Sequence, residues 1–407
     1  MVMGNRKAIK VAIVTPISPY PPDSGSRIRI YNIIRTMAQH GMKIFLLTFD
    51  SKHHGELPPD LETNVQDLRI LSPNIEADRL SPLKRFLRKI FGGPFESRPG
   101  LTREIDIALQ EWSPDFIHIE KTIGAAYLNI SRFKSKGIRL VLDEGGVNHL
   151  TYERQAAVAT HPVNKWIFKR RAKRLKLFEK TIIAQMDAVL AVSEKEENLL
   201  RSLNPKVNVL VTPNGVHERI FQEEVSPVAQ REWAAFFCGS LSYFPNRDAV
   251  EIYLRHIMPC LSKKAIKLNF VVAGGDVPTG LIEEARKNPQ FKLMGYVDSV
   301  EPFFKKFAIF VNPMRLGGGT RLKLLEAMAY GMSCVSTSIG AEGITIDNSK
   351  HAMIADTPEA FASSLEYLIR NPEQATELGN AARAMIRSRY PWPHCLNKLI
   401  SFYETAT

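Results

Sequence analysis

The stretch that decides the fold is "NPMRLGGGTRLKLLEAMAYG", residues 312–331. The apolar run "FAIFVNP" that leads into it is expected to be a buried strand, and "TRLKLLEAMAYG" a helix that Gly331 ends. Glycines between the two let backbone N–H groups approach a ligand closely, and the start of a helix favours an anion. The pattern therefore predicts a strand, a glycine loop and a helix that together bind an anionic group.

The predicted helix carries its polar residues on one face. Thr320, Lys323 and Glu326 are three residues apart, and the apolar residues available to the core fall on another face: Leu324, Leu325 and Met328. A phosphate at the helix start could pair with Lys323 or Arg321. Glu326, one turn deeper, is placed to accept two hydroxyls, as a ribose presents them. A plain loop followed by a Lys–Glu pair is the alternative, and these residues alone do not decide between them.

Length and composition limit the class of protein. The chain of 407 residues suits two domains, and 44% hydrophobic with 24% charged residues is typical of a soluble globular protein. Four scattered cysteines fit no zinc spacing and predict reduced, cytosolic thiols. The short apolar run near the N-terminus is interpreted as a first strand rather than a signal peptide, and no run is long enough to span a bilayer.

Both halves of the sequence alternate short apolar runs with helical patterns, which is typical of parallel sheets covered by helices. We therefore predict an α/β protein with two Rossmann-like, doubly wound parallel-sheet domains that face a cleft, residues 1–215 and 216–388. Residues 389–407 break at two prolines and then resume an apolar spacing, so we expect a C-terminal helix that crosses back to the first domain. Ligands of such sheets bind at the carboxyl ends of the strands. Neither GxGxxG after the first strand nor GxxxxGK[ST] is found, which disfavours a nicotinamide enzyme or a P-loop ATPase.

The net charge of +12 lies almost wholly in the first half. Residues 1–215 hold 33 Lys and Arg against 22 Asp and Glu, whereas residues 216–407 hold 21 against 20. Two segments concentrate the surplus, residues 83–91 and 165–180. Charge alone is compatible with phospholipid, a diphosphate-linked substrate or nucleic acid as partner, and equally with a solvated helix face.

Several segments, taken in order, resemble the retaining GT-B glycosyltransferases of family 4 over nearly the full length of the chain. The first half contributes "PPDSGSRIRIYNIIRTMAQHGMKIFLLTF", "LFEKTIIAQMDAVLAVSEKEENLL" and "VLVTPNGVHERIF". The second half contributes "CGSLSYFPNRDAV", "LMGYVDSVEPFF" and "GGGTRLKLLEAMAYGMSCVSTSIGAEGI", of which the last is the most specific. The resemblance implies the GT-B architecture predicted above.

The resemblance also implies a role for individual residues of the donor site. Glu326 matches the glutamate that holds the nucleotide ribose, and Gly25 the glycine that closes on the diphosphate. The other donor-binding residues come from three loops: Gly318, Gly319 and Thr320 near the sugar and phosphates, Tyr296 and Val297 at the base, and Gly239 and Ser240 in the "CGS" turn.

The sequence departs from the family pattern twice. Gly318 stands where the family commonly has a glutamate, which leaves open how the sugar hydroxyls are held. "GSLSYFPN" stands where an arginine and a lysine usually follow a "G-R-L" turn. The diphosphate charge would then fall to Arg321 and Lys323, which we expect to act in catalysis, aided by Asn246.

The implied reaction moves a sugar from a UDP- or GDP-sugar to an acceptor hydroxyl with retention at the anomeric carbon. The main task is to stabilise the departing nucleoside diphosphate. No Asp-x-Asp motif is present, so we expect neither metal nor cofactor. A retaining-glycosidase nucleophile is not needed either. In the first domain, Glu120 is predicted to be catalytic by contacting the transferred sugar. Three further residues are candidates for the cleft or the acceptor: His118, Glu144 and Asn148. A buried structural role is equally open for His118.

The expected acceptor is a lipid-linked sugar or a polysaccharide, in polysaccharide, lipopolysaccharide or glycolipid biosynthesis. We expect a cytoplasmic protein, peripheral on the inner face of the membrane through its basic segments, and no nucleic-acid partner. Two alternatives stay open. A nucleotide-sugar epimerase can share the architecture, and a non-catalytic protein could bind anionic glycans with the basic half.

Overall fold

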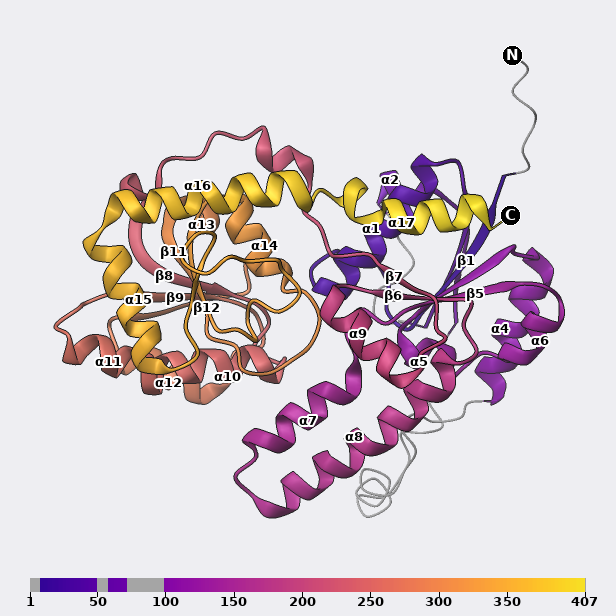
Figure 1. Cartoon of the computed structure of the whole chain (residues 1–407), viewed down its shortest axis with the longest axis horizontal. Helices are drawn as coiled ribbons and strands as arrows, with labels where there is room; N and C mark the ends of the chain where they lie inside the picture. The colour runs from indigo at the N-terminus through magenta and orange to yellow at the C-terminus, as the bar shows by residue number, and fades with distance from the viewer. Residues whose placement is uncertain (1–7, 50–57, 72–98, 407) are drawn as a thin grey trace. The chain divides into compact units, whose positions relative to one another are not determined.

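The computed structural model describes residues 8–49, 58–71 and 99–406 (Figure 1). It divides into two compact units. The first is Met1–Pro213 together with Leu396–Thr407, and the second is Asn214–Cys395. Each unit is a parallel sheet with helices on both faces, which confirms the predicted class of two Rossmann-like domains. The basic segment 83–91 lies outside the described residues.

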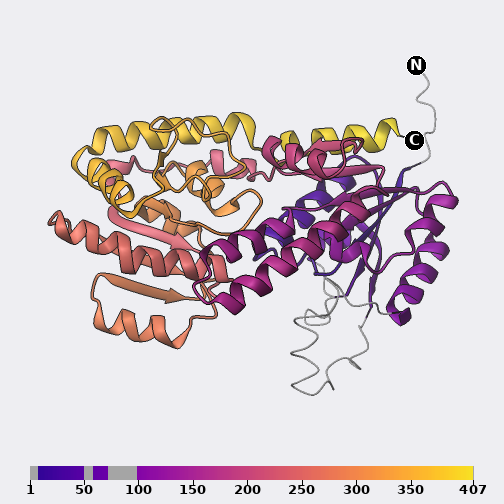
Figure 2. The ribbon, with the colours of Figure 1, turned by 60° about the horizontal axis from the view of Figure 1, so that its bottom comes forward.

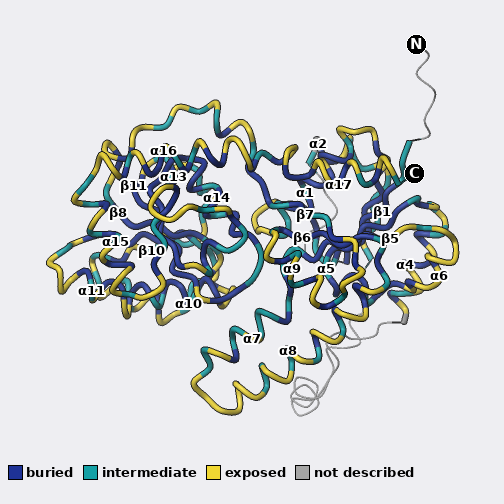
Figure 3. Tube along the Cα trace, viewed as in Figure 1, coloured by how far each residue is buried: buried dark blue, intermediate teal, exposed yellow. Residues whose placement is uncertain are grey.

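The described part of the first unit has seven parallel strands in the order β3-β2-β1-β4-β5-β6-β7. Their bounds are β1 (Lys10–Thr15), β2 (Lys43–Thr48), β3 (Val65–Ile70), β4 (Phe116–Glu120), β5 (Arg139–Asp143), β6 (Ala188–Ala191) and β7 (Val209–Val211). The central strands β1, β2 and β4 are buried nearly throughout (Figure 3). This burial explains why their sequences are unbroken apolar runs rather than alternating ones.

Helices cover both faces of this sheet. The main ones are α1 (Gly25–Gln39), α4 (Pro99–Trp112), α5 (Lys121–Ala125), α6 (Ile130–Ser135), α7 (Asn148–Val158), α8 (Pro162–Ile183), α9 (Glu194–Leu203) and the C-terminal α17 (Trp392–Thr405), with the short α2 (Pro59–Glu62) before β3. α7 and α8 run side by side as a helical hairpin, as two views show (Figures 1 and 2). Among the described residues, no helix is both long and apolar enough to cross a membrane.

The second unit has six parallel strands in the order β10-β9-β8-β11-β12-β13. Their bounds are β8 (Glu232–Cys238), β9 (Asn269–Ala273), β10 (Phe291–Gly295), β11 (Phe307–Asn312), β12 (Ser333–Ser336) and β13 (Met353–Ile354). The helices are α10 (Phe244–Ile252), α11 (Met258–Lys263), α12 (Thr279–Lys287), α13 (Glu301–Lys306), α14 (Leu322–Ala329), α15 (Pro358–Arg370) and α16 (Pro372–Arg389). A π-helical turn, Tyr253–Ile257, joins α10 to α11.

The opening stretch folds as the sequence predicts. β11 is buried along its whole length and ends in the glycine loop. α14 begins at Leu322 rather than at Thr320, because Arg321 still has an extended backbone. Gly331 follows the helix with φ +67°, the left-handed conformation expected of a C-terminal glycine.

The C-terminal helix contributes to the core of the first unit. α16 ends before Pro391, and α17 then places Leu396, Leu399 and Tyr403 at full burial. The Tyr403 ring lies edge-on to Phe116 of β4, with ring centroids 4.8 Å apart. Its hydroxyl lies 2.8 Å from Nδ1 of His118. Residues from the end of the sequence therefore complete the packing against a central strand.

We expect Leu399→Ala to lower the free energy of unfolding by about 2–5 kcal/mol, the usual cost of emptying a buried leucine site. The matched control is Lys398→Ala, one residue away and exposed, which should change it by less than about 0.5 kcal/mol. Urea unfolding followed by circular dichroism measures both. Equal stability of the two variants would show that α17 is not part of the core.

Candidate functional site

The glycine loop of the opening stretch lies at the topological switch point of the second sheet. β8 and β11 are neighbours, and the chain builds the sheet outward from β8 in one direction and from β11 in the other. Open α/β sheets bind ligands outside the carboxyl ends of the strands at such a point. The loops that leave these two strands are residues 239–243 and 313–321.

A chain of hydrogen bonds joins the two loops. Nζ of Lys323 donates to Oδ1 of Asn246 at 2.7 Å, and Nδ2 of that asparagine donates to the carbonyl oxygen of Ser240 at 2.9 Å. The same ammonium lies 4.2 Å from the centroid of the Phe237 ring. The structure thus brings together four residues that the sequence assigned to the donor site: Lys323, Asn246, Gly239 and Ser240.

Gly239 is the residue that allows this close packing. Its φ of +140° disfavours any side chain, and a Cβ there would lie 2.6 Å from both Nδ2 of Asn246 and Nζ of Lys323. A Cβ on Gly274 of the neighbouring loop would lie 2.1 Å from the carbonyl oxygen of Gly239. The glycines of "CGS" and "AGG" are therefore required by the contact between backbone segments.

Arg321 is anchored within the glycine loop. Its guanidinium turns back on its own loop, where it donates to the carbonyl oxygens of Gly318 and Leu316. The side chain is buried, and it packs beside Gly317, which has φ +95°. Arg321 therefore shapes the glycine loop, and Lys323 is the cation that faces the Asn246 bridge.

Glu326 is half-buried on α14, and its carboxylate accepts no hydrogen bond from the described part of the chain. Burial raises its pKa to about 7, against the opposite influence of Lys323. Burial lowers the pKa of Lys323 to about 8, an effect to which Arg321 adds. The two side chains lie one turn apart on α14, so the site holds an acid and a base whose charges are easily changed near neutral pH.

The remaining donor-site residues lie on nearby loops of the second unit. Tyr296 is 70% exposed, directly after Gly295 at the end of β10, with half-buried Val297 next to it. The Tyr296 ring would be 3.7 Å from a Cβ on Gly275. Thr320 is buried, and its carbonyl oxygen accepts from Nδ2 of Asn214 at 3.5 Å.

The first unit has its own switch point, between β1 and β4. Gly25, predicted to close on a diphosphate, is exposed and is the first residue of α1, where backbone N–H groups lack helical partners. Glu120 ends β4, and Lys121 turns the chain with φ +60°. Glu120 is 1% exposed, and neither carboxylate oxygen has a hydrogen-bond partner among the described residues. Burial, with Asp143 nearby, raises its pKa to about 8.

A buried polar network supports Glu120. Arg29 donates to Oδ2 of Asp143 at 2.7 Å and to Thr212 at 2.9 Å. His118 lies 3.9 Å from the same carboxylate oxygen, and burial lowers the pKa of this histidine to about 4, so it is neutral at physiological pH. The ligand atoms of His118, Glu120 and Asp143 lie within 4.8 Å of one another, a spacing that could hold a metal ion. Arg29 already supplies the positive charge that balances these acids.

Sequence reasoning missed Arg29 and Tyr403. The sequence does hint that Arg29 is buried, because Arg29 lies four residues before Ile33, on the apolar face of α1. A charged residue at such a position predicts a buried partner. Nothing in the local sequence pairs Tyr403 with His118, since 285 positions separate them.

Glu144 and Asn148, predicted as cleft or acceptor residues, are bonded to each other. Glu144 accepts from the backbone N–H and the hydroxyl of Thr122 at 3.0 and 2.9 Å, and from the side chain of Asn148. Burial raises the pKa of Glu144 well above its ordinary value. These contacts tie the turn after β4 to the turn after β5, so both residues position the loop next to Glu120.

Comparison with known proteins agrees with this geometry. Residues 24–219 match Glycosyltransferase Family 4, and residues 234–371 match Glycosyl transferases group 1. The chain belongs to this family of glycosyltransferases. Among curated proteins, it is 28% identical over 162 residues to an uncharacterized 44.6 kDa protein in the cps region of Klebsiella pneumoniae. That match spans 38% of this chain and 42% of the relative, less than half of its length.

Solved structures of glycosyltransferases share the fold over almost the whole chain. Sucrose-phosphate synthase from Thermosynechococcus elongatus superposes with a TM-score of 0.75 at 15% identity, over 98% of this chain and 99% of that one. HepE of Anabaena in complex with UDP-glucose superposes with a TM-score of 0.68 at 12% identity, over 98% of this chain and 100% of that one. The lipopolysaccharide outer core galactosyltransferase WaaB superposes with a TM-score of 0.62 at 15% identity, over 98% of this chain and 99% of that one. At these identities the likeness shows the GT-B fold.

Glu326→Gln should stabilise the protein at pH 8 and leave it unchanged at pH 5. Folding raises the pKa of this carboxyl from 4.5 to about 7, so the free energy of unfolding falls as the pH rises through that interval. The glutamine side chain does not ionise, so the variant does not lose this stability. Melting temperatures by differential scanning fluorimetry measure the difference. The control Glu283→Gln changes an exposed acid of the same unit and should alter neither value. A difference at pH 8 no larger than that at pH 5 would contradict the raised pKa.

Proposed function

We propose that this protein transfers a sugar from a nucleotide diphosphate sugar to an acceptor hydroxyl, with retention at the anomeric carbon. The observation that carries the proposal is the bridge from Lys323 through Asn246 to Ser240, beside the unpartnered carboxylate of Glu326. A cation and an acid on consecutive turns of α14 match a diphosphate followed by a ribose. Family membership supports the reaction class.

In this proposal, the second unit stabilises the leaving group. Lys323 and the N–H groups at the start of α14 face the negative charge that develops on the nucleoside diphosphate. Asn246 fixes the ammonium in place beforehand, so little reorganisation is needed when the bond breaks. Arg321 keeps the loop of Gly318 and Gly319 in the shape that admits the sugar. These groups would serve without a metal ion or a cofactor.

Glu120 of the first unit is proposed to contact the transferred sugar. With a pKa of about 8 it is mostly protonated at pH 7, so its carboxyl can donate a hydrogen bond to a sugar hydroxyl as well as accept one. His118, Asp143 and Arg29 hold the end of β4 and act as positioning residues. Retention would follow from attack on the face that the diphosphate leaves, with the phosphate taking the acceptor's proton.

UDP- and GDP-sugars are the proposed donors, and UDP-glucose is the first to test because HepE has been solved with it. Acceptors are proposed to be polysaccharide or lipid-linked sugars in polysaccharide, lipopolysaccharide or glycolipid biosynthesis. The relative in a cps region and the fold shared with WaaB support this choice.

Glu326→Ala should abolish transfer while leaving the fold intact, and Lys323→Met should slow it by about 100-fold, the usual loss for one donor aimed at developing charge. Lys292→Met, an exposed lysine of the same unit, is the matched control and should retain full activity. The assay incubates radiolabelled nucleotide sugars with candidate acceptors, with and without EDTA, and proton NMR identifies the anomer formed.

Four outcomes would each contradict part of the proposal. Isomerised nucleotide sugar without transfer would favour an epimerase, and binding without turnover would favour a glycan-binding protein. Full activity of Glu326→Ala would remove the ribose assignment. Loss of activity in EDTA that magnesium restores would replace the metal-free account of the leaving group.

We also propose that the protein is cytoplasmic and associates with the inner face of the membrane. α8 carries an exposed apolar row beside its basic residues, with Val163 54%, Trp166 50% and Leu177 68% exposed. These three positions fall on one side of the helix. A basic helix with such a row is typical of segments that lie on an anionic bilayer.

The double variant Trp166→Ser with Leu177→Ser should reduce co-sedimentation with vesicles of anionic phospholipid without changing the charge of the protein. Tyr367→Ser removes a similarly exposed ring from the second unit and serves as the control. Binding should fall with added salt, because surface charge is screened. Failure of the unaltered protein to sediment with anionic vesicles at low salt would end this proposal.

A further inference from the structure

The hairpin of α7 and α8 has a fixed base. Oε1 of Glu179, on α8, accepts from the backbone N–H groups of Asn148 and His149 at 3.0 and 3.2 Å. Its other oxygen lies 2.5 Å from Nδ1 of His149. These N–H groups belong to the first turn of α7 and have no helical partner, so a buried carboxylate satisfies them. The two helices are therefore held together by a specific bond at one end.

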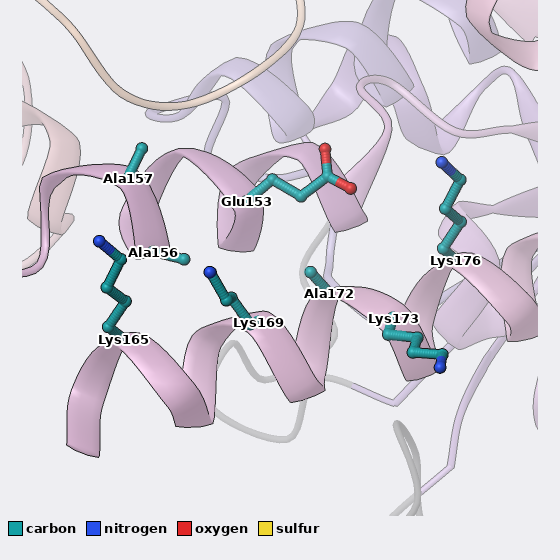
Figure 4. Close-up of a pocket in the computed structure, with 8 residues that line it drawn as sticks. All are labelled: Glu153, Ala156, Ala157, Lys165, Lys169, Ala172, Lys173 and Lys176. Atoms are coloured by element: carbon teal, nitrogen blue, oxygen red, sulfur yellow. The ribbon is translucent and has the colours of Figure 1, made fainter. Parts of the chain in front are cut away.

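A pocket of about 370 Å³ lies between the two helices (Figure 4). Small side chains on both helices leave this space: Ala156 and Ala157 on α7 and Ala172 on α8. Lysines of α8 form the rest of one wall, and the single acid that lines the pocket is Glu153 of α7. In Figure 4 the ammonium groups of Lys165 and Lys169 point toward α7, whereas Lys173 turns away from it.

The hairpin around the pocket carries a large positive charge. Residues 148–183 contain nine Lys and Arg and two Asp and Glu, a surplus of 7 out of the chain's net +12. Within the described parts of the chain, no ion pair involves the lysines that line the pocket: Lys165, Lys169, Lys173 and Lys176. Lysines at such helical spacing repel one another, so an anion that lay along the array would stabilise it.

We propose that this pocket binds a segment of an acidic glycan, the class of acceptor that the proposed function would extend. Eleven residues separate the first and last of these lysines, so the cations extend over about 16 Å of helix at 1.5 Å per residue. A linear array of cations matches a polymer with a charge on successive sugar units. The alanine methyl groups and the lysine stems offer an apolar surface to the C–H faces of the sugar rings.

Glu153 distinguishes a glycan from a phospholipid as the occupant. A lipid phosphate offers no hydroxyl to offset its repulsion by this carboxylate, whereas each unit of an acidic glycan carries, beside its charge, hydroxyls that can donate hydrogen bonds to Glu153. The exposed row of Val163, Trp166 and Leu177 lies on a different side of α8 from the wall formed by Lys165 and Lys169. The surface suited to a bilayer and the pocket suited to a glycan are therefore separate.

The test measures binding of a galacturonic acid hexamer to the full chain by isothermal titration calorimetry, with the neutral maltohexaose as the reference ligand. We expect the acidic hexamer to bind and the neutral one not to bind. Replacing Lys165, Lys169 and Lys176 by Ser together should weaken binding about tenfold or more, because three ion pairs are lost.

The control triple variant replaces Lys43, Lys136 and Lys206 by Ser. These three lysines are exposed, belong to the same unit and change the net charge by the same amount. The affinity of this control variant for the hexamer should stay within about threefold of that of the unaltered protein, because salt screens charges that lie far from the pocket. Ala157→Phe fills the pocket without changing charge and should also weaken binding. Melting temperatures of all variants verify that they fold.

Three results would overturn the proposal: no binding of the acidic hexamer at low salt, equal weakening by both triple variants, or unaltered binding by Ala157→Phe. Loss of vesicle binding in the pocket triple, with no binding of the hexamer, would assign the pocket to a lipid headgroup instead. Because no nucleotide sugar is present, the result does not depend on transferase activity. A failed transfer assay therefore leaves this measurement interpretable, and a failed binding assay leaves the donor-site assignment intact.

Discussion

Helices cover both faces of the two parallel sheets, so a charged side chain within a central strand would be buried at a high cost in free energy. Charged side chains are therefore expected at the strand ends. Each unit therefore gathers its functional groups where neighbouring strands stop. In the second unit this place holds Lys323 and Glu326, and in the first it holds Glu120. Burial of these side chains moves their pKa values toward neutral pH. The architecture thus produces both the position and the reactivity of the polar residues.

The two half-sites solve the problem of buried charge differently. At Asp143, the Arg29 guanidinium bonds one carboxylate oxygen and the neutral imidazole of His118 lies 3.9 Å from it, whereas the other oxygen has no hydrogen-bond partner among the described residues. Both oxygens of the buried Glu120 carboxylate lack a hydrogen-bond partner within the described residues, a costly arrangement that natural proteins keep mainly where a ligand completes it. Glu326 is half-buried and accepts no hydrogen bond from the described residues. We propose on this basis that Arg29 and His118 support their site, whereas Glu120 and Glu326 meet the substrate.

Most of the fold could be predicted from the sequence, because buried parallel strands leave unbroken apolar runs and the opening stretch carries a strand, glycines and a helix in order. The side-chain directions could not. Arg321 and Lys323 look equivalent in sequence, yet one turns back onto carbonyl oxygens of its own loop and the other reaches across to α10. Glu144 likewise looks like a site acid, but it bonds to Thr122 of the adjacent turn. Such choices depend on tertiary neighbours that no local pattern encodes.

The chain passes from the first unit to the second after Pro213 and returns after Cys395, so the first unit is assembled from both ends of the sequence. During synthesis, β4 emerges long before α17, because the whole second unit lies between His118 and the Tyr403 hydroxyl that it meets. The first unit therefore cannot complete its core while the ribosome is still making the second. The apolar surface that α17 covers stays open until α17 has been made, so the second unit can finish folding first.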